Sequence, residues 1–82
     1  MGNIRDIGAL VSVAEAIEKT NRGGAFFRYE TAERELRKHY FLLTRSSIED
    51  DDSEVAQVFR PLLERIKAGY KRLMATEEAA RI

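Results

Sequence analysis

The feature that most constrains the fold is a long apolar stripe in the C-terminal half of the chain. Its residues recur at steps of three and four, the spacing that places side chains on one face of an α-helix. The stripe consists of Val55, Val58, Phe59, Leu62, Ile66, Tyr70 and Leu73. Leu63 and Met74 widen the apolar arc to about 160° of the helix circumference. An arc of that width predicts a helix over residues 53–78 that packs against two other helices.

Three residues inside this predicted helix affect its shape and packing. Pro61 lies within the stripe, where a proline either kinks a helix or begins a new one. Because the apolar phase is unchanged on both sides of Pro61, we expect a continuous helix with a kink there, and a break just before the proline is the alternative. Ala68 and Gly69 are small, so we expect another helix to approach closely at these two positions.

A second helical stripe lies near the N-terminus. It is formed by Ile4, Ile7, Leu10, Val11, Ala14 and Ile17. The pattern stops before Gly23 and Gly24, and paired glycines readily adopt the left-handed conformation that ends helices. We therefore predict a first helix over residues 3–20.

The middle of the chain allows two interpretations. Residues 25–29 have the composition of a strand, and a short strand after the glycines is one alternative. The pairs Glu30/Arg34 and Glu33/Arg37 have the spacing and order that support a helix. We favour a helix over residues 26–45, since a single strand would need the edge of another chain for pairing.

Together these segments predict an all-α fold, a three-helix antiparallel bundle in which residues 1–82 form a single helical domain. A chain of this length buries only about 60% of the surface that its unfolded form exposes, so association with another chain is a common supplement. The expected core is Ile7, Leu10, Val11, Ala14, Ile17, Tyr29, Leu36, Tyr40, Leu43, Val55, Phe59, Leu62, Ile66, Tyr70 and Leu73.

Composition removes several classes of function. There are no cysteines, which removes disulfides, thiolate metal sites and a cysteine nucleophile. Fourteen basic residues balance fourteen acidic ones, so no net field attracts nucleic acid or an anionic membrane. Apolar runs are short and no apolar signal core begins the sequence, so we expect no membrane association and a cytoplasmic protein.

No arrangement of polar residues matches a catalytic, metal or cofactor motif. The single histidine, His39, lies one turn after Glu35 and is interpreted as a surface histidine beside a carboxylate. The acidic residues 49–54 lack the glycine and glutamate positions of a calcium-binding loop and are interpreted as a solvated loop that caps the last helix. We therefore expect no catalytic residue, no metal, no cofactor and no enzymatic activity.

The predicted second helix has a basic side with aromatic residues at its edges. Arg34, Lys38 and Arg45 cluster on one side of the helical wheel, and Phe27 and Phe41 flank them. Such a surface suits a nucleic acid, with cations on phosphates, or a protein interface, where aromatic residues and arginine are enriched. A third interpretation is that the phenylalanines only fill gaps in the core.

The excess of apolar residues favours a small non-enzymatic protein-binding module, such as an adaptor, an assembly subunit or a stoichiometric inhibitor. We expect it to self-associate, with a dimer preferred. The candidate interface residues are Phe27, Phe41, Leu63 and Met74. The alternative function is a small nucleic-acid-binding regulator that uses Arg34, Lys38 and Arg45.

Overall fold

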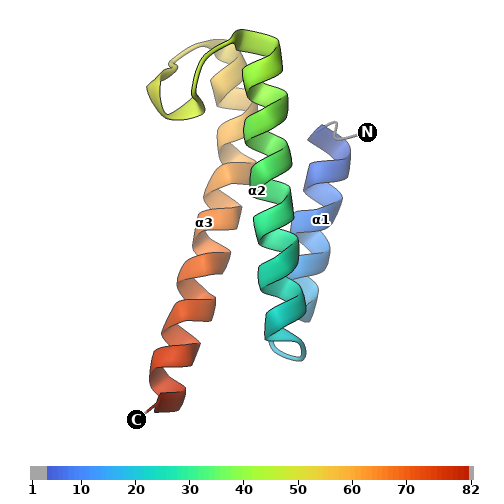
Figure 1. The fold of residues 1–82 in the computed structure, drawn as a ribbon, viewed down its shortest axis with the longest axis vertical. Coiled ribbons are helices and arrows are strands. Elements are labelled where there is room, and N and C mark those ends of the chain that lie inside the picture. The colour runs from blue at the N-terminus through green and yellow to red at the C-terminus, as the bar shows by residue number, and fades with distance from the viewer. Residues whose placement is uncertain (1–3, 82) are drawn as a thin grey trace.

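Three helices form an antiparallel bundle, as the sequence predicts. The computed structural model describes the backbone of residues 4–81 and the side chains of residues 4–75. In that part of the chain α1 (Ile4–Ile17), α2 (Arg22–Thr44) and α3 (Glu54–Arg81) run alternately down, up and down (Figure 1). A short 3-10 helix, η1 (Ile48–Asp50), lies in the loop between α2 and α3. The described backbone contains no strand, and residues 25–29 are helical.

α3 sets the length of the molecule. It has 28 residues, and the longest dimension of the bundle is 43 Å. Pro61 lies inside α3 without ending it. Its ring is on the exposed side of the helix, where the carbonyl that loses its N–H partner can bond to water. The continuous helix expected from the unbroken apolar phase is confirmed.

The turn between α1 and α2 corrects the role predicted for the two glycines. Gly23 and Gly24 lie in the first turn of α2, and neither has a positive φ. The helix begins earlier than predicted because Asn21 caps it, with its side-chain oxygen accepting the N–H of Gly24 at 2.9 Å. A Cβ on Gly24 would lie 2.6 Å from the Asn21 side chain, so the glycine makes room for the cap. α1 ends earlier than predicted, at Ile17, and residue 3 lies outside the described residues.

The core lies where the three helices face one another. Its buried members are Ile7, Val11, Ala14, Ala25, Tyr29, Ala32, Leu36, Tyr40, Ile48, Ala56, Phe59, Leu63, Ile66 and Leu73. Four other residues of the expected core, Leu10, Ile17, Leu62 and Tyr70, are partly buried against it. The prediction missed the alanines of α2 and α3, whose small side chains let the helices approach, and Ile48, which lies in a loop and has no helical period.

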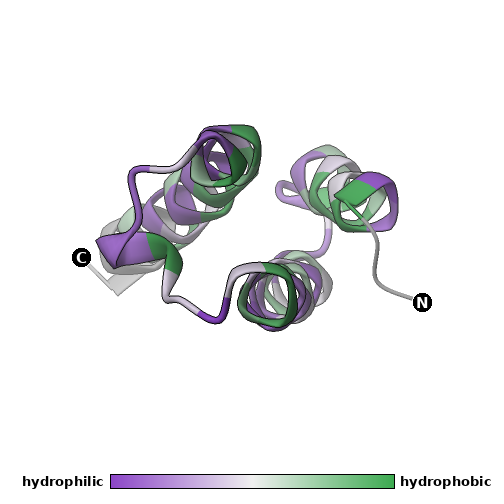
Figure 2. Ribbon diagram, turned by 90° about the horizontal axis from the view of Figure 1, so that it is seen from above, coloured by the Kyte–Doolittle hydropathy of each residue, from purple (hydrophilic) through white to green (hydrophobic). Residues whose placement is uncertain are grey.

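Two expected core residues are wrong. Leu43 is 59% exposed and Val55 is 37% exposed. Both lie at the end of the bundle where α2 and α3 extend beyond the described start of α1 (Figure 1). α1 has only 14 residues against 23 in α2, so it does not cover this end. Seen from above, the last turn of α2 is apolar around much of its circumference (Figure 2).

The acidic loop packs against the core and begins α3. Ile48 of η1 is buried. Asp51 accepts hydrogen bonds from the N–H and the hydroxyl of Ser53, at 3.0 and 2.9 Å. Ser53 in turn accepts the N–H of Ala56 at 3.4 Å, so a residue of this loop caps α3, as predicted. Arg60 of α3 donates to the carbonyl oxygens of Ile48 and Asp51 and holds the loop in place.

Candidate partner-binding surface

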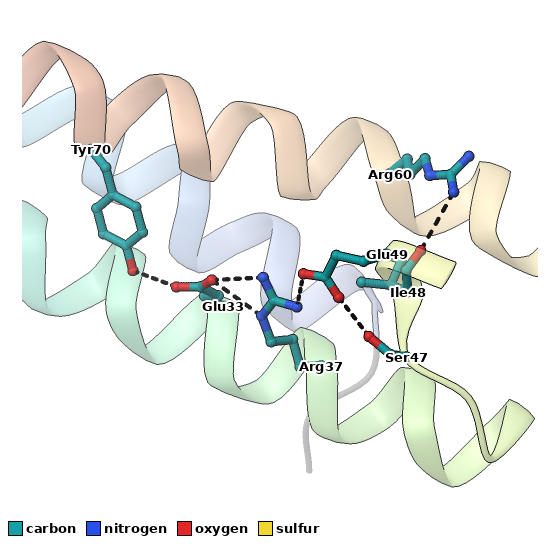
Figure 3. A network of polar contacts seen from close by, with 7 residues as sticks. All are labelled: Glu33, Arg37, Ser47, Ile48, Glu49, Arg60 and Tyr70. Atoms are coloured by element: carbon teal, nitrogen blue, oxygen red, sulfur yellow. Dashed lines mark hydrogen bonds and ion pairs between the residues drawn. The ribbon is translucent and has the colours of Figure 1, made fainter. Parts of the chain in front are cut away.

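One polar network joins α2 to α3 and η1 (Figure 3). The hydroxyl of Tyr70 donates to Glu33 at 2.9 Å, and Arg37 donates to the same carboxylate at 3.0 and 3.1 Å. Arg37 also pairs with Glu49 of η1, whose second oxygen accepts the hydroxyl of Ser47. Hydrogen bonds from Ser47 and Arg37 lower the pKa of Glu49 to about 2. The predicted pair of Glu33 and Arg37 is confirmed.

A second network joins α1 to α2 and α3. Arg72 donates to both oxygens of Glu18 at 2.8 Å, and the buried hydroxyl of Tyr29 donates to Glu18 at 2.5 Å. Arg65 donates to Glu15 at 2.6 and 3.1 Å. Burial raises the pKa of Tyr29 to about 12, and the hydrogen bond to Glu18 acts in the same direction. Arg65 and Arg72, which reach across from α3, are therefore both paired with carboxylates.

The side of α2 that points away from the bundle is different in character. Phe27, Arg34, Lys38 and Phe41 lie within about 60° of one another on the helical wheel, opposite the buried residues of α2, and Arg45 follows directly after the last residue of the helix. We call these five residues the outer face of α2. The phenylalanines are 62% and 51% exposed. Among the ion pairs between described residues, none includes a cation of this face.

Arg45 is held in an unusual backbone conformation. It caps the C-terminal end of α2 with a φ of 59°, and its N–H donates to the carbonyl of Phe41 at 2.7 Å. Among the described residues it is the one non-glycine residue with a positive φ. Glycine is the usual residue at this position, because a side chain in the left-handed conformation costs about 1 kcal/mol. Sequence reasoning did not find this strain, since it expected the helix to include Arg45.

The other two candidate interface residues lie elsewhere. Leu63 is 3% exposed and belongs to the core, so the expectation that it contacts a partner is corrected. Met74 is 60% exposed and lies far from Phe41, near the opposite end of the bundle. With Arg22 and Phe26 it lines a groove of about 330 Å³ between α2 and α3. The four residues predicted as one interface therefore do not form a single patch.

His39 lies at a groove between α1 and α2. Its ring stacks on Phe59 at a centroid distance of 5.8 Å, so one of its sides is packed. Asp6 and Glu35 line the same groove, which has a volume of about 480 Å³. Within the described part of the chain, no three histidine, aspartate or glutamate side chains are grouped closely enough to hold a metal ion.

Comparisons of this chain with protein-family models, with curated proteins and with solved structures find no match. In the part of the chain that the structure describes, no helix combines the length and the apolar character needed to cross a membrane. The chemistry of the outer face of α2 is therefore the main guide to function.

Proposed function

We propose that this chain is a non-enzymatic protein-binding module that binds its partner through the outer face of α2. The observation that carries the proposal is the exposure of Phe27 and Phe41 on a helix whose opposite side is already buried. Neither ring is needed to complete the core. Aromatic residues and arginine are enriched at the centres of protein interfaces, and this face combines both. An adaptor, an assembly subunit and a stoichiometric inhibitor all fit this description.

The test of partner binding is recovery of host proteins on the immobilised chain. Replacing Phe27 and Phe41 with serine should abolish recovery of a specific partner, because buried aromatic anchors contribute about 2 kcal/mol or more each. Val13→Ser is the matched control, since Val13 is a half-exposed apolar residue of α1. Recovery that survives the serine substitutions at both phenylalanines would refute the proposal.

We also propose that the chain forms a dimer through the open end of the bundle. Leu42, Leu43, Val55 and Val58 are exposed near this end of α2 and α3, and Leu42 also lines the groove between α1 and α2. The outer face of α2 suits a dimer poorly. If two copies of α2 lay antiparallel with residue 36 of each at the same level, Arg34 of one copy would lie opposite Lys38 of the other. Like charges placed opposite each other are destabilising.

Light scattering coupled to size exclusion tests the dimer. The wild-type chain should have twice the monomer mass, and Val58→Glu should return it to the monomer with its helical content unchanged. Gln57→Glu adds the same charge at a neighbouring exposed position and should leave the dimer intact. A monomeric wild-type chain at tens of micromolar would remove the dimer from the proposal and leave partner binding standing.

The second candidate function is nucleic-acid binding by the same surface. The observation that favours it is that Arg34, Lys38 and Arg45 have no ion pair among the described residues. Fluorescence anisotropy with single-stranded and duplex DNA decides it. Binding through phosphates must weaken steeply between about 50 and 200 mM salt, and binding that ignores salt would exclude this function.

A further inference from the structure

We infer that the partner of this chain is an acidic amphipathic helix, which lays its apolar side on Phe27 and Phe41 and places carboxylates opposite Arg34, Lys38 and Arg45. The inference rests on the proposed protein-binding function and names its partner. It is carried by the charge, spacing and exposure of the outer face of α2.

The cations of the outer face of α2 are available to a partner. Arg37, Arg65 and Arg72 each pair with a carboxylate on α1, on α2, on η1 or in the turn after α1. Arg34 makes no such pair among the described residues, although Glu30 lies one turn before it on the same helix. The cations of the outer face can therefore meet the carboxylates of a partner without breaking any ion pair that the structure shows.

The aromatic and cationic residues of this face have a regular spacing. Phe27, Arg34 and Phe41 are seven residues apart, and Lys38 and Arg45 follow the last two by four residues. With this spacing Arg34 lies between the two rings in one row of the helix, and Lys38 lies in the neighbouring row, so apolar and cationic side chains alternate along the face. Coiled coils combine apolar and charged positions in a comparable way to select a partner of opposite charge. The two rings are about 21 Å apart along the helix, so a partner helix of about 18 residues spans both.

Two other occupants fit the outer face of α2 less well. A second copy of α2 would bring the same cations together, as argued above. A nucleic acid carries a negative charge at every phosphate. The acidic loop lies close to the C-terminal end of α2, because Glu49 pairs with Arg37 and Asp51 accepts the hydroxyl of Tyr40. The carboxylates of this loop would repel the phosphates. A helix with carboxylates only opposite the three cations avoids this repulsion.

The backbone at Arg45 agrees with this assignment. An arginine occupies a left-handed position that favours glycine, and strain of this kind is concentrated at binding sites. Arg45 follows the last residue of α2, four positions after Phe41. There it can contact the last carboxylate of a bound helix.

The experiment uses the full chain and a displayed library of amphipathic helices of about 18 residues. Leucine occupies the apolar positions, and the flanking positions vary among Glu, Gln and Lys. Selection should enrich Glu at the flanking positions. The selected peptide should bind at least about tenfold more weakly when its glutamates become glutamine. The same loss should follow when Arg34, Lys38 and Arg45 of the protein become glutamine.

The matched control replaces three exposed lysines outside this face, Lys19, Lys67 and Lys71, with glutamine, and should change the affinity less than about twofold. The inference would be overturned by an equal loss of affinity in the control variant. It would also be overturned if selection enriched peptides without a preference for Glu, or enriched no peptide. Tighter, salt-sensitive binding of oligothymidylate would replace it with nucleic-acid binding. If a host partner needs the phenylalanines but not the cations, the proposed function stands and this inference fails.

Discussion

The ring of Tyr29 lies in the space that a side chain on Gly69 would occupy. A Cβ built on Gly69 would be 2.2 Å from Cζ of that ring, far closer than any real contact. Tyr29 is fully buried, and its hydroxyl is held by Glu18 and Arg72. The close approach of α2 and α3 at this level therefore depends on the glycine. This confirms the sequence expectation for Gly69, whereas the neighbouring Ala68 is exposed.

Gly69→Ala should destabilise the fold by about 1–3 kcal/mol, because Tyr29 cannot move without losing its hydrogen bonds. Urea denaturation followed by circular dichroism measures this change. Gly23→Ala is the control, since nothing lies within 4 Å of its added Cβ. That substitution should leave the free energy of unfolding unchanged or raise it by about 0.5–1 kcal/mol. Equal effects of the two substitutions would contradict the packing described here.

Tyr70→Phe should lower the free energy of unfolding by about 1 kcal/mol, because it removes the hydrogen bond to Glu33 and keeps the ring that packs on Phe26. Glu33→Gln should cost more, since it also weakens the pair with Arg37. Thermal and urea denaturation of the two variants give the comparison. A larger loss of stability in Tyr70→Phe than in Glu33→Gln would mean that the network contributes little beyond the hydrogen bond between Tyr70 and Glu33.

Stability should fall as the pH rises from 10 to 12. Burial raises the pKa of Tyr29 from an ordinary value of 10.0 to about 12, so the folded state holds a proton that the unfolded chain releases near pH 10. The stabilisation is complete below pH 10 and is lost as the pH approaches 12. Denaturation midpoints across this range, with tyrosinate absorbance as a second signal, test the prediction. Tyr29→Phe should flatten the decline.

Arg45→Gly should raise the free energy of unfolding by about 1 kcal/mol, because glycine has no side-chain strain at a φ of 59°. The same substitution should weaken binding of the acidic peptide, since it removes one cation of the outer face. Arg45→Gln separates the two effects, because glutamine keeps the strain of a long side chain in this conformation but carries no charge, so it should weaken binding without raising stability. If the glycine variant is more stable and binds unchanged, Arg45 has no part in recognition.

Part of the candidate surface could be predicted from the sequence. The basic and aromatic residues share one side of a helix because they recur at helical spacing, and that spacing is local. Leu63, in contrast, was wrongly predicted to be an interface residue. It lies at the edge of a broad apolar arc, and only the positions of the other two helices decide whether such an edge is buried or exposed.

The sequence by itself determined that the chain forms three helices and which side of each helix is apolar, because the 3.6-residue period and the polar loops between segments are properties of the chain alone. The tertiary structure decided how far the helices overlap. That overlap leaves Leu43 and Val55 exposed and buries Ile48. It also decided which arginines are paired, because partners such as Glu15 and Arg65 are brought together only by packing of α1 against α3. Arg34, Lys38 and Arg45 take part in no ion pair between described residues, because the packing of the helices brings no carboxylate within reach of them there.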